Sequence, residues 1–199
     1  VLFRSGEPIE PEVWQWYYDV VGKKEAAIVD TWWQTETGGF LCSTKPAIDP
    51  MKPGSAGPPA LGIYPAIYDE NAQEVTVGSG RAGNICIRNP WPGIMQTVWK
   101  DDDRFVRQYY QKYCRDPKSQ DWRDWPYFAA DAAVVTADGY FRILGRVDDV
   151  INVAGHRLGT KELESVCLTV SSVAEAAVVP VVDEIKGRVP VFYVSLKPG

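Results

Sequence analysis

Hydrophobic positions change their spacing along the chain, and the first clear period is helical. Residues 11–21 are predicted as a helix, because Pro11 suits a first helical position and Gly22 suits the stop. The large apolar side chains of this segment fall on one broad face: Trp14, Tyr17, Tyr18 and Val21. A helix with this pattern is expected to bury that face against the rest of a domain.

Short apolar runs bounded by turn residues predict strands after this helix. The strand candidates are residues 26–29, 63–68, 84–88, 132–136 and 140–144. The last two flank Ala137-Asp138-Gly139, and an Asp-Gly turn between alternating runs is a hairpin signal. Residues 45–65 are rich in Pro and Gly and are predicted as a loop, whereas residues 101–126 are predicted as a helix followed by an irregular insertion.

The pattern after Arg146 is typical of a small α+β unit. The strand candidates here are residues 148–153, 173–182 and 189–196. Thr160 is expected to cap a helix that carries Glu162 in its first turn. The sequence therefore predicts a mixed α/β (α+β) fold class with two domains, residues 1–147 and residues 148–199.

Composition and charge exclude several classes of protein. The chain has 199 residues, a net charge of −5 and a pI near 5.0, so a basic nucleic-acid surface is not expected. No apolar run approaches the roughly 18 residues that span a bilayer, and no secretory pattern follows Arg4. We therefore expect neither nucleic acid nor a membrane as a partner. Eight Trp and ten Tyr indicate a substantial core or a ligand cleft.

Cysteine spacing indicates free thiols rather than a disulfide framework. The four cysteines are widely separated: Cys42, Cys86, Cys114 and Cys167. Such spacing is typical of a reducing compartment, and a cytoplasmic protein is predicted. A Cys/His metal site is not expected, because His156 is the single histidine in the sequence.

Residues 30–39 combine hydroxyls, a carboxylate and two glycines after a predicted strand. Strand ends that open into loops are where α/β sheets place ligand-binding groups. Thr35 and Thr37 offer hydroxyls, and Glu36 offers a carboxylate for a metal ion. The glycines at the end permit a close backbone approach. The alternative is an aromatic-walled turn that only packs.

Other polar residues allow two interpretations each. The carboxylate of Asp131 suits a ribose diol, but an Asp ahead of a hairpin also caps turns. Arg146 and Arg157 lie near predicted strand ends, and guanidinium groups match phosphate oxygens. Ion pairs with nearby aspartates are the alternative for both. His156 is either a structural histidine or a catalyst.

Five sequence blocks, taken together, resemble the motifs of one enzyme family. The blocks are Gly-Glu-Pro-Ile at 6–9, Asp-Thr-Trp-Trp-Gln-Thr-Glu-Thr-Gly-Gly at 30–39, Tyr-Phe-Ala-Ala-Asp at 127–131, Asp-Gly-Tyr at 138–140 and Gly-Arg-Val-Asp-Asp-Val-Ile-Asn-Val-Ala-Gly-His-Arg-Leu-Gly-Thr at 145–160. In this order and spacing they resemble AMP-forming acetyl-CoA synthetases (acetate–CoA ligases), within the adenylate-forming acyl-CoA synthetase superfamily. The resemblance covers nearly the whole chain from Gly6 onward.

The resemblance implies a ligase and the part of it that this chain represents. Acetate and ATP would give acetyl-adenylate and pyrophosphate, and coenzyme A would displace AMP to give acetyl-CoA. The implied cofactors are ATP/AMP, coenzyme A and Mg²⁺. The implied architecture is the C-terminal part of the large AMP-binding domain followed by the start of a mobile C-terminal domain.

The resemblance also assigns roles to individual residues. The implied nucleotide-binding residues are Gly6, Glu7, Pro8, Asp30, Thr31, Trp32, Trp33, Gln34, Thr35, Asp131, Arg146 and Arg157. The implied catalytic residues are Thr35, Glu36 and Arg157, with Glu36 also the metal ligand. Trp33 would wall the acyl pocket, and Asp148 would be the hinge of the mobile domain. Ala154 and Gly155 would bind coenzyme A.

A few positions depart from the family pattern. The residue before the ribose-binding aspartate is often Gly but is Ala130 here. The residue before Gly155 is often Ser but is Ala154, as in some propionyl-CoA relatives. Val170 stands where the family often has His, and residues 115–125 look longer than usual.

The family's phosphate loop and C-terminal catalytic Lys are not found in the sequence. The chain is therefore expected to be a fragment that does not catalyse adenylation alone, and residues 1–5 fit the family poorly. The alternatives are a propionyl-CoA or other short-chain acyl-CoA synthetase, or a non-catalytic nucleotide-binding module of the same fold. The expected partners are the small-molecule substrates, with acetyltransferase and deacetylase regulation of the full-length protein.

Overall fold

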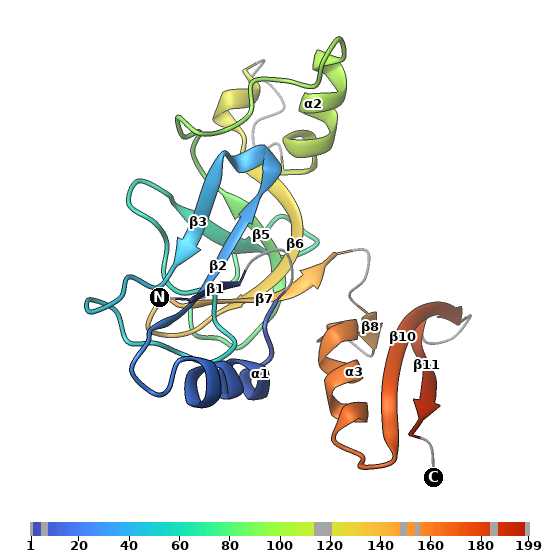
Figure 1. Cartoon of the computed structure of the whole chain (residues 1–199). Coiled ribbons are helices and arrows are strands. Elements are labelled where there is room, and N and C mark those ends of the chain that lie inside the picture. Colours follow the sequence, from blue (N-terminus) through green and yellow to red (C-terminus); the bar gives the residue numbers. More distant parts are fainter. Residues whose placement is uncertain are drawn as a thin grey trace. The chain divides into compact units, whose positions relative to one another are not determined.

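The chain folds into two compact units, Val1–Ile143 and Leu144–Gly199, and each is described by itself (Figure 1). The computed structural model describes residues 2–4, 8–113, 121–147, 151–153, 156–183 and 187–197. The domain boundary predicted between residues 147 and 148 stays a prediction.

The first sheet of the larger unit has the order β1-β2-β3. Its strands are β1 (Leu2–Arg4), β2 (Ile28–Gln34) and β3 (Gly39–Ser43), with β1 parallel and β3 antiparallel to β2. The strand predicted at 26–29 therefore begins two residues later, at Ile28. It continues to Gln34, through residues that were predicted to lie in a loop. Pairing with β3 satisfies the backbone of these residues and lets Trp32 point into the core.

The second sheet has four strands in the order β4-β5-β6-β7. They are β4 (Pro65–Tyr68), β5 (Gly83–Ile87), β6 (Tyr127–Val135) and β7 (Phe141–Arg146). The predicted strands are confirmed, although β6 begins before residue 132. Residues 45–64 form neither helix nor named strand, which confirms the predicted loop.

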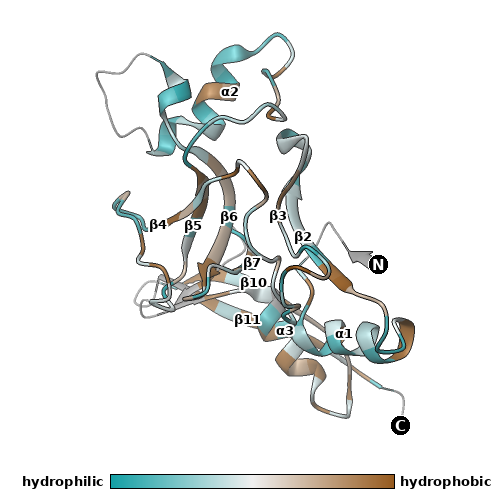
Figure 2. Ribbon diagram, turned by 90° about the vertical axis from the view of Figure 1, so that its left-hand side faces the viewer, coloured by the Kyte–Doolittle hydropathy of each residue, from teal (hydrophilic) through white to brown (hydrophobic). Residues whose placement is uncertain are grey.

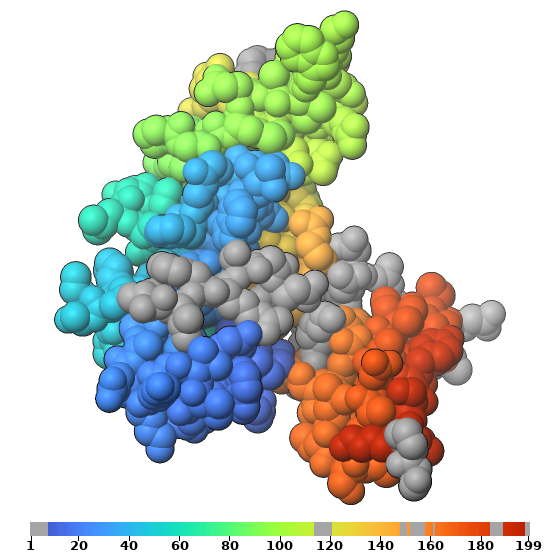
Figure 3. Space-filling model, viewed as in Figure 1, coloured from blue at the N-terminus to red at the C-terminus, as the bar shows by residue number. Residues whose placement is uncertain are grey.

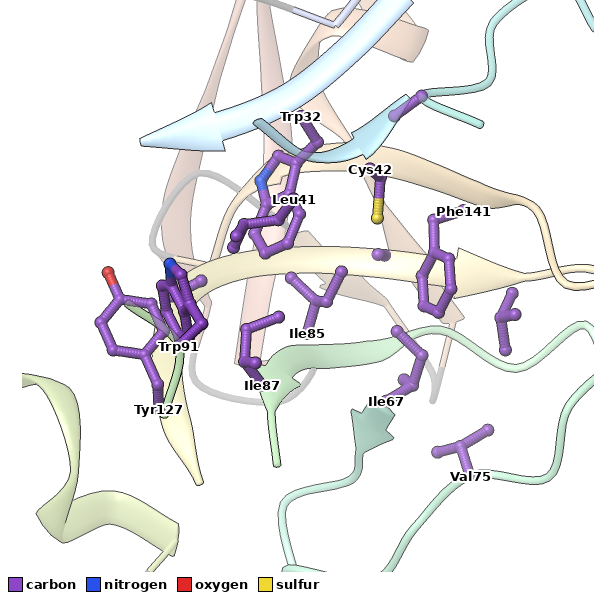
Figure 4. Close-up of a cluster of buried hydrophobic side chains, with 14 of the residues drawn as sticks. Trp32, Leu41, Cys42, Ile67, Val75, Ile85, Ile87, Trp91, Tyr127 and Phe141 are labelled. Atoms are coloured by element: carbon purple, nitrogen blue, oxygen red, sulfur yellow. The ribbon is translucent and has the colours of Figure 1, made fainter. Parts of the chain in front are cut away.

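A continuous hydrophobic core joins the two sheets (Figure 4). Side chains from both sheets contribute to it: Trp32, Leu41, Cys42, Ile67, Ile85, Ile87, Tyr127 and Phe141. Each buried side chain of this size contributes about 1.5–3 kcal/mol of transfer free energy. The core therefore fixes β2 against β6, which carry most of the candidate site.

The predicted helix at 11–21 forms, but its geometry changes midway. α1 (Pro11–Trp16) is regular, whereas η1 (Tyr17–Val21) is π-helical and ends with the Gly22 amide bonded to the Tyr17 carbonyl. Trp14 is buried, as predicted for this face, and its ring stacks on Tyr18. Val21 is exposed, so its place on the apolar face was wrong, because the wider π-turn rotates it away.

A short outer helix, α2 (Asp102–Tyr109), forms within the predicted helical and irregular region. The Asp101 carboxylate caps it by accepting from the Arg104 amide, and the buried Phe105 ring anchors it. In Figure 2 the helix is mainly hydrophilic, with a hydrophobic band. Two short 3₁₀ turns follow, η3 (Gln111–Tyr113) and η4 (Trp122–Asp124).

The smaller unit contains the predicted helix and strands. Its elements are β8 (Ile151–Val153), β9 (His156–Leu158), α3 (Thr160–Leu168), β10 (Val173–Asp183) and β11 (Gly187–Leu196). β10 and β11 form an antiparallel pair, and β9, which was not predicted, pairs with β8. Thr160 is the first helical residue rather than the cap, because Gly159 is the last extended residue. In the described parts of both units, no helix is long and apolar enough to cross a membrane.

Candidate functional site

The connection between β2 and β3 is a tight, internally capped turn, η2 (Thr35–Thr37). The Thr37 hydroxyl accepts from the Gln34 amide at 3.0 Å and lies 2.7 Å from the Gln34 carbonyl oxygen. Thr37 is buried, so its hydroxyl has a structural role here and is not presented to a ligand. Thr35, by contrast, is exposed at the start of the turn.

Residues 91–95 hold this turn from outside. The Trp91 indole N–H donates to the Thr37 carbonyl at 3.0 Å, and the Met95 amide donates to the Glu36 carbonyl at 2.8 Å. Gly38 has φ +68°, and a Cβ added there would lie 2.1 Å from the Gly93 carbonyl oxygen. The close backbone approach expected at this glycine is therefore present, but it is made to the chain itself.

Asp131 is a buried residue of β6 whose side chain meets β2. Its Oδ2 accepts from the Trp32 indole N–H at 2.9 Å and from the Gln34 side-chain amide at 2.9 Å. Two donors stabilise a carboxylate that is only 7% exposed. The hairpin turn that follows is closed by the Thr136 hydroxyl, which donates to the Asp138 carboxylate. The ribose and turn-capping roles of Asp131 both stay predictions.

The side-chain amide of Gln34 is fully engaged within the protein. Its Nε2 also donates to the Ala129 carbonyl at 2.7 Å, and its Oε1 accepts from the Tyr127 hydroxyl at 2.8 Å. Burial, and after it the negative charge of Glu36, raise the pKa of Tyr127 far above its ordinary value. The hydroxyl therefore stays protonated and remains a donor, so Gln34 is held rigidly against Asp131.

A β-bulge at Ala130 sets the direction of Asp131. Asn84 pairs with Ala132 and Cys86 with Phe128, so three residues of β6 lie opposite one residue of β5. Ala130 has φ +57°, a left-handed conformation that favours glycine. The bulge re-aims the strand so that Asp131 meets β2. It also explains physically why the family often has glycine at this position.

Glu36 is held by a residue from α2 that the sequence did not single out. The Tyr109 hydroxyl donates to Glu36 Oε1 at 2.7 Å, and the Tyr109 ring stacks on Tyr127 at 5.5 Å between centroids and 7° between planes. In Figure 3 green atoms of the region that includes α2 lie directly against the blue atoms of the β2–β3 region. A chain of contacts thus runs from Glu36 to Asp131 through two tyrosines and Gln34.

The predicted magnesium ligand can be compared with this geometry. The described residues contain no group of three or more His, Cys, Asp or Glu side chains that could hold a metal ion. Mg²⁺ is commonly held by one or two carboxylates plus substrate phosphates, so a dedicated protein cage is not required. Glu36 Oε2 has no hydrogen-bond donor among the described residues, which fits a ligand of that kind.

The remaining predicted site residues are placed as follows. Asp30 is buried and its Oδ1 accepts from the Thr31 amide at 2.8 Å, while Trp33 is 43% exposed on β2. Pro8 is half-buried and Arg146 is exposed at the end of β7. The predicted residues Gly6, Glu7, Asp148, Ala154 and Gly155 lie outside the described residues, as does the side chain of Arg157. All these roles stay predictions.

Sequence reasoning missed the residues that position the site. Tyr109 and Trp91 contact it from distant parts of the chain and stand in no motif, whereas Tyr127 stands in the 127–131 block but was given no role there. The one available signal was Ala130, which was noted as a departure from glycine without its conformation being foreseen.

Comparison with known proteins assigns the chain to a family. The profile of the AMP-binding enzymes matches residues 1–99, and that of the AMP-binding enzyme C-terminal domain matches residues 162–199. The crystal structure of the anthranilate CoA ligase AuaEII in complex with anthranoyl-AMP is similar, with a TM-score of 0.75 and 26% identity, covering 98% of this chain and 34% of that chain. The fold is thus that of an adenylate-forming ligase, as predicted, and the chain belongs to the AMP-binding enzyme family.

Curated relatives define the branch of the family that the chain resembles. Acetyl-coenzyme A synthetases of Gemmatimonas aurantiaca and Deinococcus radiodurans are each 46% identical to it, and that of Rubrobacter xylanophilus is 48% identical. Each match covers 100% of this chain and 29% of the relative. The chain therefore spans under a third of the length of the relatives it matches.

The left-handed conformation of Ala130 predicts the effect of restoring glycine. Ala130→Gly should be neutral or stabilise the protein by up to about 1 kcal/mol. Glycine removes the cost of the left-handed conformation, roughly 1–2 kcal/mol, and this gain offsets the stabilisation of the unfolded chain by the added backbone entropy. Urea unfolding monitored by Trp fluorescence measures the difference.

Ala132→Gly is the matched control in the same strand. Ala132 is fully buried and is not among the residues with positive φ, so glycine there should destabilise by about 1 kcal/mol. An equal loss in both variants would contradict the strained bulge.

Proposed function

We propose that the protein containing this chain activates acetate as acetyl-adenylate and transfers the acetyl group to coenzyme A. The observation that carries the proposal is the buried Asp131 carboxylate, held by Trp32 and Gln34 in a chain 48% identical to an acetyl-coenzyme A synthetase. Identity of 43–48% to such enzymes over the length of this chain supports acetate as the acid. The anthranilate CoA ligase with anthranoyl-AMP supports an adenylate intermediate.

In the proposed reaction Asp131 holds the ribose. A carboxylate has acceptor sites for both ribose hydroxyls, and the donors on Oδ2 fix its plane before the nucleotide arrives. Thr35, exposed on η2, would lie near the α-phosphate, and Arg146 and Arg157 would bind phosphate or ribose oxygens. A carboxylate oxygen of acetate attacks the α-phosphorus and pyrophosphate leaves; the coenzyme A thiol then attacks the acyl carbon and AMP leaves.

Glu36 is the proposed protein ligand of Mg²⁺. The ion would supply positive charge that neutralises the phosphates as negative charge develops on them. The structural support is the position of the carboxylate at a turn whose backbone is fixed by Met95 and Trp91. With the backbone fixed, the Glu36 carboxylate can change position only by changing its side-chain rotamer.

Trp33 is the proposed wall of the acyl pocket. It lies on β2 opposite Phe40 of β3, with its ring partly exposed while Trp32 beside it is buried. A large rigid ring at that position would admit a short acid and reject longer ones. Coenzyme A binding at Ala154 and Gly155 and a hinge at Asp148 complete the proposal. We further propose a cytoplasmic location, supported by the free thiols of Cys42 and Cys167.

The activity is tested by isotope exchange between pyrophosphate and ATP in the protein encoded by the complete reading frame. Exchange should require acetate. The exchange rate with propionate in place of acetate tests propionate as the alternative substrate. A folded protein that catalyses no pyrophosphate–ATP exchange with either acid would contradict the proposal. Faster exchange with propionate than with acetate would instead identify a propionyl-CoA synthetase.

Replacement of the tryptophan tests the acyl pocket. In the complete protein, Trp33→Gly should shift the ratio of kcat/KM values from acetate towards octanoate by about tenfold or more, because each methylene accommodated in an apolar pocket contributes roughly 1–3 kcal/mol. Trp99→Gly is the matched control, since Trp99 is a strongly exposed tryptophan outside the site. A ratio that stays the same in Trp33→Gly would remove Trp33 from the pocket.

Removal of the buried carboxylate tests the ribose contact. Asp131→Ala should weaken ATP about a hundredfold or more, because two charge-assisted bonds of roughly 1.5–3 kcal/mol each are lost. Asp131→Asn should fall between, since it keeps an acceptor without the charge. Calorimetry with ATP measures these affinities on folded protein.

A dideoxyribose analogue of ATP supplies the control for this experiment. Without ribose hydroxyls it has no contact to lose, so Asp131→Ala should hardly change its affinity. Equal losses for ATP and the analogue would assign Asp131 a purely structural role.

A further inference from the structure

We propose that Tyr109 is a positioning residue of the nucleotide site, which fixes one oxygen of the Glu36 carboxylate so that the other can bind the divalent cation. This inference rests on the proposed function. The geometry that carries it is the 2.7 Å hydrogen bond from the Tyr109 hydroxyl to Glu36 Oε1.

Tyr109 is itself held in a fixed orientation. Its ring packs against Phe105, which is buried at the previous turn of α2, at 5.8 Å between centroids. The ring also stacks in parallel on Tyr127, whose hydroxyl is bonded to Gln34. Aromatic contacts on two sides of this half-buried ring restrict the movement of the Tyr109 hydroxyl away from Glu36.

The Glu36 side chain depends on this contact more than its backbone does. The backbone carbonyl of Glu36 is bonded to the Met95 amide, and the neighbouring Thr37 carbonyl is bonded to Trp91. Among the described residues, Tyr109 is the one hydrogen-bond partner of the Glu36 carboxylate. Loss of the tyrosine hydroxyl would therefore release the carboxylate while the turn stays in place.

The hydrogen bond to Oε1 of Glu36 also determines how this carboxylate can bind a cation. With Oε1 accepting from a neutral donor, the negative charge is retained, and Oε2 remains available as a monodentate ligand. Monodentate carboxylate oxygen suits Mg²⁺, which takes few protein ligands and completes its octahedral shell with phosphate and water.

The adjacent tyrosine provides a matched control. Tyr110 is 1% exposed and packs in the same aromatic cluster, but its hydroxyl has no hydrogen-bond partner in the described part of the chain. Tyr109→Phe and Tyr110→Phe each remove one hydroxyl from neighbouring rings, the first half-buried and the second buried. The two variants should differ only in properties that depend on the hydrogen bond to Glu36.

Calorimetric ATP affinities, measured with Mg²⁺ and with EDTA on the complete protein, test the inference. Tyr109→Phe should weaken ATP about tenfold with Mg²⁺ and leave the affinity in EDTA unchanged, whereas Tyr110→Phe should match the unaltered protein in both. In a Glu36→Gln background, Tyr109→Phe should have no further effect. Melting temperatures verify that each variant is folded.

The contradicting outcomes are distinct. An unchanged Mg²⁺-dependent affinity in Tyr109→Phe, an equal loss with and without Mg²⁺, or a full loss in the Glu36→Gln background would each overturn the positioning role. Failure of the unaltered protein to bind ATP in either medium would instead overturn the proposed function. The two failures cannot be confused, because the first requires nucleotide binding and the second is its absence.

Discussion

The hydrogen bonds from Trp32 and Gln34 to Asp131 are the interactions on which the rest of the site depends. A carboxylate that is 7% exposed would be strongly unfavourable without donors, and both donors come from one strand of the neighbouring sheet. The two bonds therefore hold β2 against β6 of the other sheet and fix the orientation of the acid. The hydrophobic core around Trp32 then excludes water from one side of the contact, which strengthens it.

The positions of the other polar groups follow from this contact. Gln34 is fixed to β6 by Asp131, by the Ala129 carbonyl and by Tyr127, so the turn that follows it starts from a rigid point. Tyr127 supports the ring of Tyr109, and Tyr109 reaches Glu36. Two acids that the proposed reaction uses for ribose and cation are thus connected by one set of packed side chains. Such preorganisation lowers the cost of binding a charged nucleotide.

Local patterns predicted those parts of this structure that local forces determine. The helix at 11–21, the loop at 45–65 and the two β-branched strands of the smaller unit follow from periodicity, turn residues and propensity. The extension of β2 and the presence of β3 were missed, because their stability comes from pairing across the η2 turn rather than from an alternating pattern. Val21 was misplaced because a π-turn cannot be read from apolar spacing.

The candidate acids were predictable from the sequence, whereas the residues that position them were not. Asp131 and Glu36 stand in recognisable motifs, but the bond from Tyr109 to Glu36 joins positions far apart in the chain. The conformation of Ala130 depends on pairing between β5 and β6, which residue identity alone does not disclose. Tertiary contacts of this kind become visible only when the strands are placed in space.

The central claim is that the carboxylate held by Trp32 and Gln34 receives the ribose of an acyl-adenylate. A crystal structure of the complete protein with a non-hydrolysable acetyl-adenylate analogue tests this claim most directly. The account predicts both ribose hydroxyls within hydrogen-bonding distance of the Asp131 carboxylate, with the bonds from Trp32 and Gln34 retained. An analogue bound with its ribose away from Asp131, and the carboxylate still contacting protein donors alone, would contradict it.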